Sequence, residues 1–215
     1  MNKRVIVWGA TVFLGVSTAM SAETLKEAYK DAFLMGCSVN DSIVSGADRA
    51  SQEIVIRQFN TITLENSMKA EVVNPRRGSY NFRAADAFVE FGEKNDMFII
   101  GHTLVWHNQT PAWFFQDEEG NPNTPEEQIE RMRSHIEAVA GRYAGRVDAW
   151  DVVNEVIDND GSYRPTTWVK SVGDGDEMVK AAFRFAEKYA PDTELYYNDF
   201  NAWRPEKRDG IVRMV

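Results

Sequence analysis

Residues 147–160 read VDAWDVVNEVIDND, an apolar and β-branched run that stops abruptly at Asn154-Glu155. Such a run predicts a strand that is buried on both faces of a parallel sheet. A carboxylate at the end of a buried strand needs either a partner, such as an arginine or a helix N-terminus, or a chemical function. The stretch therefore predicts a parallel α/β fold. It also makes Glu155 the first candidate for chemistry, in need of a second reacting group.

Strand-like runs alternate with helical patterns along the chain. The predicted strands cover residues 33–39, 59–66, 97–107, 147–155 and 193–200, and the predicted helices cover 47–58, 83–95, 125–143 and 176–189, with another beginning at Pro205. The helix at 125–143 has the clearest start, because Thr124 can cap it, Pro125 suits its first turn and Glu127 completes a capping box. Unbroken alternation of this kind predicts a parallel sheet.

Two architectures fit a parallel sheet, an open doubly wound sheet and a closed barrel. Polar residues end several predicted strands, and barrel active sites are built at these carboxyl ends. No glycine-rich phosphate loop follows any strand, which removes the usual reason for an open nucleotide-binding sheet. The sequence therefore favours a (β/α)8 TIM barrel, of which this chain covers about the first five strand–helix units. We expect the 215-residue sequence to be incomplete at its C-terminal end.

Composition limits the partners. The chain is 43% hydrophobic and 27% charged, as in a globular protein. Its formal net charge of -9 argues against binding to nucleic acid, whose phosphates require basic surfaces, and is compatible with an uncharged substrate.

The first 22 residues resemble a secretory signal peptide. Lys3 and Arg4 precede an apolar run at residues 5–16, and small residues follow around 19–22. A membrane anchor is the alternative, but the run is shorter than the roughly 20 apolar residues that span a bilayer. We expect a signal peptide at 1–22, a catalytic domain at 23–215, and a secreted protein, periplasmic or extracellular, without a membrane segment after cleavage.

Two further stretches supply polar and aromatic side chains at predicted strand ends. TLENSMK contains Glu65, Asn66 and Lys69, for which a simple Glu65–Lys69 ion pair is the alternative interpretation. GHTLVWHNQTPAWF contains His102, Trp106, His107, Gln109 and Trp113. A metal site is disfavoured, because the two histidines are five residues apart on a strand and no HExxH motif is present. Indole, amide, imidazole and carboxylate groups together suit a sugar, and the sequence predicts neither a metal nor a cofactor.

Five motifs resemble those of glycoside hydrolase family 10, the endo-1,4-β-xylanases. They are TLENSMK, GSYNFRAADAFVEF, GHTLVWHNQTPAWF, WDVVNE and YYNDFN, in family order from about residue 25 to the end of the chain. Asn-Glu at a strand end is common to many barrel glycosidases, whereas the ENSMK motif together with HTLVWH is specific to this family.

The resemblance implies a role for individual residues. Glu155 resembles the acid/base catalyst, and Asn154 resembles the residue that hydrogen-bonds the sugar 2-hydroxyl. His102 and Trp106 resemble residues of the same subsite and its floor. Glu65, Asn66, Lys69 and Gln109 resemble the contacts to the next sugar toward the non-reducing end. Phe200 stands where many members have tyrosine, and Asp151 either orients His102 or makes a core-side hydrogen bond.

A retaining glycosidase also needs a nucleophile, which family members carry after a seventh strand. No residue of the 215 fits, since Glu65, Asp151 and Asp199 are better explained by binding or scaffolding. The resemblance implies a monomeric enzyme acting on xylan or xylo-oligosaccharides, with its nucleophilic glutamate beyond residue 215. We expect the 215 residues alone to be inactive and not to fold cooperatively. A relative acting on cellulose or mannan, and a non-catalytic carbohydrate-binding protein, are the alternatives.

Overall fold

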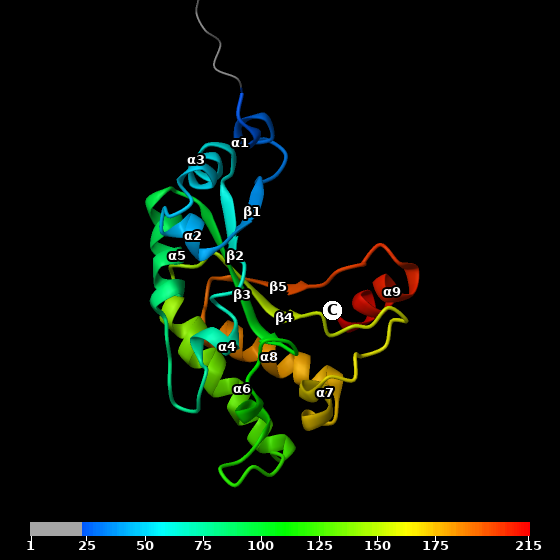
Figure 1. Cartoon of the computed structure of the whole chain (residues 1–215). Coiled ribbons are helices and arrows are strands. Elements are labelled where there is room, and N and C mark those ends of the chain that lie inside the picture. Colours follow the sequence, from blue (N-terminus) through cyan, green and yellow to red (C-terminus); the bar gives the residue numbers. More distant parts are fainter. Residues whose placement is uncertain (1–22) are drawn as a thin grey trace, which may run out of the picture.

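A computed structural model describes residues 23–215, and the predicted signal peptide at 1–22 lies outside the described residues. Five parallel strands form one sheet in the order β1-β2-β3-β4-β5, each strand pairing with the next along the chain (Figure 1). The strands are β1 (Gly36–Val39), β2 (Thr61–Leu64), β3 (Phe98–Trp106), β4 (Ala149–Asn154) and β5 (Glu194–Asn198). The predicted parallel sheet is confirmed.

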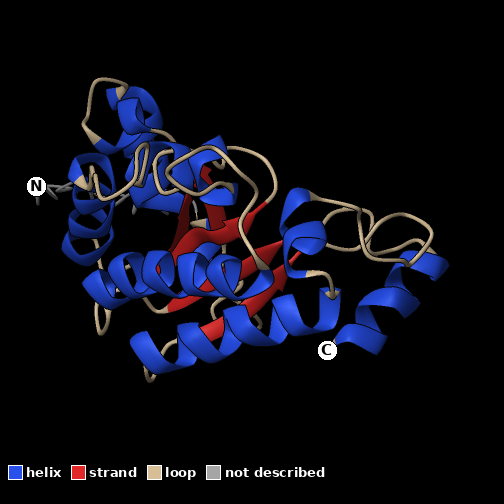
Figure 2. Ribbon diagram, turned by 90° about the horizontal axis from the view of Figure 1, so that it is seen from below, coloured by secondary structure: helices blue, strands red, loops and turns tan. Residues whose placement is uncertain are grey.

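Helices connect successive strands. They are α1 (Leu25–Ala28), α2 (Asp41–Val44), α3 (Arg49–Gln58), α4 (Ala70–Val73), α5 (Arg83–Lys94), α6 (Pro125–Ala140), α7 (Thr167–Val172), α8 (Gly175–Tyr189) and α9 (Pro205–Met214), with short 3-10 helices η1 (Ala112–Phe115) and η2 (Gly141–Tyr143). The long helices α5, α6 and α8 pack against the sheet on one side (Figure 2). Five successive strand–helix units in this order are what part of a (β/α)8 barrel contains. None of the helices in residues 23–215 combines the length and apolar character needed to cross a bilayer.

The predicted element boundaries need small corrections. The first strand begins at Gly36 and not at residue 33, since Phe33 and Leu34 are exposed apolar residues before the sheet. The helix predicted at 125–143 ends at Ala140 and continues as the 3-10 turn η2. Its capping box is confirmed: Thr124 Oγ1 accepts from the Glu127 amide at 3.3 Å, and Glu127 Oε2 accepts from the Thr124 amide at 2.8 Å. The sequence patterns did not predict the short helices α1, α2, α4 and α7.

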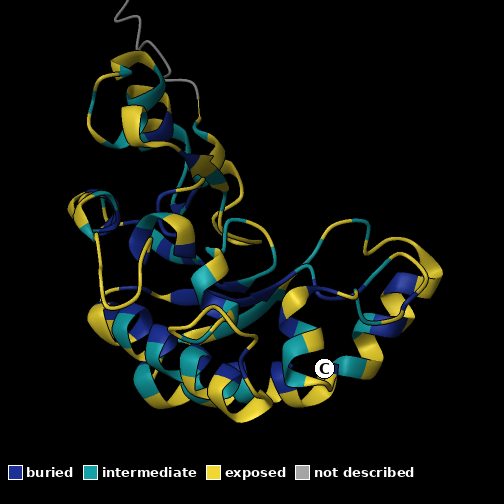
Figure 3. Cartoon of the chain, turned by 60° about the horizontal axis from the view of Figure 1, so that its bottom comes forward, coloured by how far each residue is buried: buried dark blue, intermediate teal, exposed yellow. Residues whose placement is uncertain are grey.

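The strand β4 lies at the centre of the core. All six of its residues are buried, whereas no residue of β5 is fully buried (Figure 3). Trp150 and Val152 are 0% exposed, and Val153 is 1% exposed. Burial on both faces explains why the VDAWDVV run lacks polar alternation, and the one charged residue within β4, Asp151, is itself buried.

Candidate active site

Most of the predicted site residues lie at the carboxyl ends of neighbouring strands. Glu65 follows β2, Trp106 ends β3, Asn154 ends β4 and Phe200 follows β5, whereas His102 lies in the middle of β3. Because the strands are parallel and consecutive, these ends meet along one edge of the sheet.

Glu155 is held by its backbone immediately after β4. Its φ of 57° lies in the left-handed region, which is uncommon for a residue other than glycine. Its amide donates to the Asn198 carbonyl oxygen at 2.9 Å, and its carbonyl oxygen accepts from Arg164 Nε at 3.1 Å. A strained residue with both peptide groups bonded is a recurrent feature of functional sites.

The carboxylate of Glu155 is hydrogen-bonded to the indole of Trp106. Trp106 Nε1 donates to Glu155 Oε2 at 3.2 Å, which joins the ends of β3 and β4. Asn154 is 3% exposed and accepts at Oδ1 from Asn198 Nδ2 at 2.9 Å. With its amide turned over, Asn154 would instead donate to the Asn198 carbonyl oxygen at 3.1 Å and accept from Trp106 Nε1 at 3.3 Å. The orientation of the Asn154 amide therefore depends on whether the Trp106 indole donates to Glu155 or to Asn154. In either case Trp106 lies beside both residues.

Lys69 contacts residues from both the TLENSMK and the GHTLVWHNQTPAWF stretches. Its ammonium donates to Asn66 Oδ1 at 3.1 Å and to Gln109 Oε1 at 2.9 Å, and it lies 4.6 Å from the centroid of the Trp106 ring. Burial lowers the pKa of Lys69, although the charges of Glu65 and Glu155 oppose that change. Four predicted residues, Asn66, Lys69, Trp106 and Gln109, therefore form one contiguous polar and aromatic surface.

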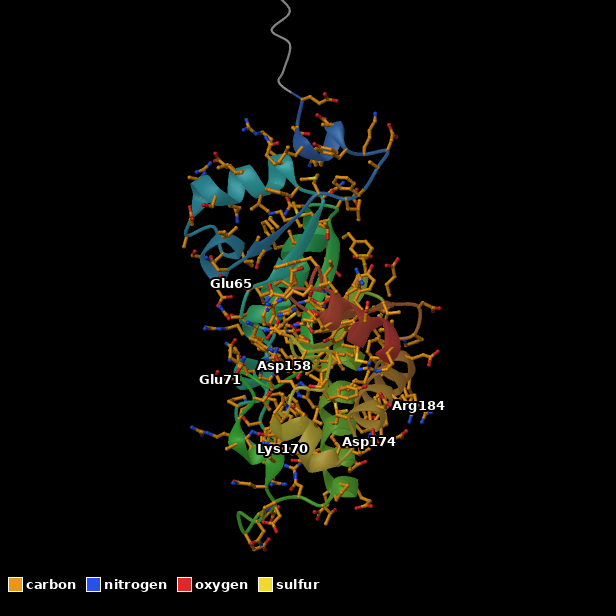
Figure 4. The ribbon with its side chains drawn as sticks, turned by 90° about the vertical axis from the view of Figure 1, so that its right-hand side faces the viewer. Glu65, Glu71, Asp158, Lys170, Asp174 and Arg184 are labelled. Carbon is orange, nitrogen blue, oxygen red and sulfur yellow. The ribbon has the colours of Figure 1, made fainter. Side chains whose placement is uncertain are left out.

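Glu65 is near enough for its charge to act on Lys69, but the hydrogen bonds that join Asn66, Lys69 and Gln109 do not involve its side chain. It is exposed, and Figure 4 shows it at the edge of the molecule. Among the ion pairs of residues 23–215, none joins Glu65 to Lys69, so the alternative of a simple loop ion pair is not supported.

His102 is fixed by Asp151. The distance between His102 Nδ1 and Asp151 Oδ2 is 2.8 Å, and the two side chains are 14% and 12% exposed. The backbone carbonyl of Asp151 also accepts from Thr103 Oγ1 at 2.7 Å. The sequence left two roles open for Asp151, and both are observed. Its carboxylate orients the His102 imidazole, and its backbone carbonyl makes the core-side hydrogen bond.

Phe200 lies on the loop after β5 and is 45% exposed. Lys207 Nζ is 4.1 Å from its ring centroid and Arg164 Cζ is 5.7 Å from it. The ring is thus accessible but has cations beside it.

The sequence motifs gave no role to His107 or Asn198, and they did not identify Arg164. Arg164 holds the Glu155 carbonyl, Asn198 contacts both Asn154 and Glu155, and His107 adjoins Trp106 with ring centroids 5.9 Å apart. Burial and then the nearby charge of Arg164 lower the pKa of His107. Asn198 is a polar residue at the end of a predicted strand, whereas no sequence pattern distinguishes Arg164. Within the described part of the chain, no cluster of three or more His, Cys, Asp or Glu side chains could hold a metal ion.

Comparison with known proteins identifies the family. The model of glycosyl hydrolase family 10 matches residues 24–215. Endo-1,4-beta-xylanase A of Caldicellulosiruptor saccharolyticus is 42% identical over 194 residues, which are 89% of this chain and 55% of that protein. Endo-1,4-beta-xylanase A of Xylanibacter ruminicola is 39% identical over 199 residues, which are 93% of this chain and 53% of that protein. This chain therefore spans about half the length of these curated relatives.

Solved structures agree with the sequence match. A GH10 endoxylanase from a sugarcane soil metagenome superimposes with a TM-score of 0.85 at 41% identity, covering 89% of this chain and 56% of that one. A xylanase from Paenibacillus barcinonensis superimposes with a TM-score of 0.83 at 37% identity, covering 90% of this chain and 58% of that one. The predicted barrel fold and the predicted family are both confirmed. The chain belongs to glycosyl hydrolase family 10.

Proposed function

We propose that the protein to which this chain belongs is an endo-1,4-β-xylanase that hydrolyses internal bonds of xylan with retention of configuration. The observation that carries the proposal is the arrangement around Glu155. Its carboxylate accepts from the Trp106 indole at 3.2 Å, and its backbone is bonded on both sides at the end of the most buried strand. Family membership and relatives named endo-1,4-beta-xylanase support the choice of substrate.

In this proposal Glu155 acts twice. In the first step, a carboxylate nucleophile attacks the anomeric carbon while the Glu155 carboxyl gives its proton to the departing glycosidic oxygen. In the second step, the ionised Glu155 takes a proton from water, whose oxygen attacks the same carbon and releases the nucleophile. At the anomeric carbon each step forms one C–O bond and breaks another, a proton moves from Glu155 in the first step and to Glu155 in the second, and Glu155 returns to its starting protonation state.

In this proposal residues 1–215 do not supply the nucleophile. Retaining enzymes hold their two carboxyl groups about 5–5.5 Å apart. We assign the second carboxylate to a later strand of the barrel, in keeping with the chain spanning about half of its relatives' length. The 215 residues alone are accordingly expected to leave xylan intact.

The remaining site residues bind sugar in this proposal. Asn154 hydrogen-bonds the 2-hydroxyl at the cleavage point, with His102 and Trp106 in the same subsite. The surface formed by Asn66, Lys69 and Gln109, with Glu65 at its rim, binds the next xylose toward the non-reducing end. Phe200 stacks on the sugar beyond the cleaved bond. The ammonium and amide groups suit hydroxyls, and the indole suits the apolar face of a sugar ring.

Localisation is proposed from residues 1–22. A cleaved signal peptide would make the protein periplasmic or extracellular, although one structural neighbour is an intracellular xylanase. We also propose a monomer without cofactor. Sequencing the N-terminus of the protein recovered from its natural source tests the signal peptide, since cleavage should leave a chain that begins near residue 23. A mature chain that begins at Met1 would refute the signal peptide.

The substrate is tested by initial rates of the full-length protein on xylan, cellulose and mannan. Xylan should be hydrolysed fastest. A clear preference for mannan or cellulose would refute the proposed substrate but leave a glycosidase. Binding of xylan without turnover of any of the three would favour a carbohydrate-binding protein.

A further inference from the structure

A buried ion pair between Lys207 and Asp199 is linked by hydrogen bonds to the backbone that follows Glu155. Lys207 Nζ and Asp199 Oδ1 are 2.6 Å apart, with side-chain exposures of 0% and 1%. Asp199 Oδ1 also accepts from the Phe200 amide at 2.8 Å, and its other oxygen accepts from the Tyr197 hydroxyl. Burying two charges is costly, and apolar residues of the same volume often stabilise a fold at least as well. Stability alone is therefore a weak explanation for the pair.

The Tyr197 hydroxyl connects this pair to the backbone that follows Glu155. Its oxygen accepts from the amides of Val156 and Ile157, each at 3.1 Å. With the bond that it donates to Asp199, the hydroxyl makes the three hydrogen bonds that a phenol can make. The contact is specific, because it fixes the two peptide groups directly after a residue whose φ is 57°.

Each part of the chain of contacts has a defined orientation. Burial, and then the hydrogen bond to Asp199, raises the pKa of Tyr197, so its hydroxyl keeps its proton. Lys207 donates to Asp199 Oδ1, which leaves Asp199 Oδ2 to accept from the Tyr197 hydroxyl. A protonated phenol that faces a carboxylate must turn its lone pairs toward the amides, and the amides cannot rotate away without losing their acceptor.

We propose that Tyr197, Asp199 and Lys207 are positioning residues that hold Glu155 in the orientation required to protonate the leaving group. This inference rests on the proposed function. Substrate does not need to touch any of the three. They act through the Val156 and Ile157 amides, while Asn198 and Arg164 bond the two peptide groups of Glu155 itself.

The test is the leaving-group dependence of Tyr197→Phe in the full-length protein. The measured quantity is kcat/KM for phenyl xylobioside, whose departure needs a proton, and for 2,4-dinitrophenyl xylobioside, whose departure does not. Displacement of a catalytic group by about 1 Å costs on the order of 100-fold. Tyr197→Phe should therefore lower kcat/KM at least about tenfold for the phenyl substrate and less than about twofold for the dinitrophenyl substrate.

Tyr143→Phe is the matched control. Tyr143 is fully buried, whereas Tyr197 is partly buried, and the Tyr143 hydroxyl likewise donates to an aspartate, Asp86 Oδ1 at 2.9 Å, which in turn pairs with Arg142. It contacts Trp150 near the beginning of β4, whereas Tyr197 contacts the backbone after the end of that strand. Tyr143→Phe should lower the melting temperature without changing the ratio of the two kcat/KM values.

Equal loss on both substrates, or no loss in a folded Tyr197→Phe protein, would overturn the positioning role. If Tyr197→Phe does not fold, Asp199→Asn replaces it, because the amide keeps the shape of the side chain but cannot accept at both positions. The same selective loss is expected, and a uniform one counts against the role. Measuring Glu155→Ala on the same two substrates separates the positioning role from the proposed function. If Glu155→Ala lowers kcat/KM equally for both substrates, the proposed function fails. If Glu155→Ala is selective for the phenyl substrate and the Tyr197 variant is not, only the positioning role fails.

Discussion

Replacement of Lys207 by methionine should unfold the protein far more easily than replacement of its neighbour Arg208. Methionine has nearly the length of the lysine stem but no charge. It would leave the Asp199 carboxylate, 1% exposed, with only the Tyr197 hydroxyl and the Phe200 amide as partners.

The magnitude follows from burial. Removing one partner of a buried pair costs about 3–5 kcal/mol, because the other charge stays buried without compensation. Arg208 pairs with Asp209 at 2.9 Å, but the two side chains are 57% and 67% exposed. An exposed pair contributes about 0–1 kcal/mol, so Arg208→Met should be nearly neutral.

Urea unfolding of the full-length protein, followed by tryptophan fluorescence, measures both variants. The free energy of unfolding should fall by at least about 3 kcal/mol for Lys207→Met. It should fall by less than about 1 kcal/mol for Arg208→Met. Adding Asp199→Leu to Lys207→Met should restore part of the loss, because the uncompensated charge is then gone. Equal effects of Lys207→Met and Arg208→Met would refute the reasoning that burial makes the pair matter.

Three further results are expected. Burial lowers the pKa of His135 from 6.5 to about 4. The folded state therefore binds fewer protons than the unfolded state between these pH values, and the free energy of unfolding should fall by up to about 3 kcal/mol as the pH drops from 6.5 to 4. His135→Gln should flatten that slope in urea titrations, and an unchanged slope would contradict the assignment. In Gly101→Ala the new Cβ would lie 2.3 Å from the Trp150 ring, which should lower the free energy of unfolding by about 1–3 kcal/mol. In Gly141→Ala the nearest atom is 3.8 Å away, so calorimetry should show no loss of stability for this variant. Lys69→Met removes charged hydrogen bonds worth about 1.5–3 kcal/mol each, so KM for xylo-oligosaccharides should rise at least about tenfold with a smaller change in kcat, and an unchanged KM would exclude Lys69 from binding.

Much of the fold could be predicted because the apolar residues of the sequence pattern are the residues that are buried in the structure. The residues of the VDAWDVV run that form β4 are all buried, and Thr124 and Glu127 form the capping box that their spacing predicts. The error at Phe33 has the same origin. Its apolar side chain continues the strand pattern, but the chain enters the sheet only at Gly36.

The site could be predicted where a short motif contains several of its residues. Asn66 and Lys69 are three positions apart and are in direct contact. Interactions between distant segments have no such pattern. Lys207 lies in the charged run RPEKRD, whose other residues are solvent-exposed, and nothing in the run distinguishes the one lysine that is 0% exposed. The left-handed φ of Glu155 and the Tyr197 hydroxyl beneath it likewise depend on the pairing of β4 with β5.

The central claim, that Glu155 is the acid/base catalyst, is tested most directly by Glu155→Ala in the full-length protein. General acid catalysis contributes about 10²- to 10⁴-fold. Glu155→Ala should therefore lower kcat/KM by that factor for phenyl xylobioside, while glycosyl-enzyme formation from 2,4-dinitrophenyl xylobioside keeps its rate. If both substrates slowed by the same factor, Glu155 would not be the acid.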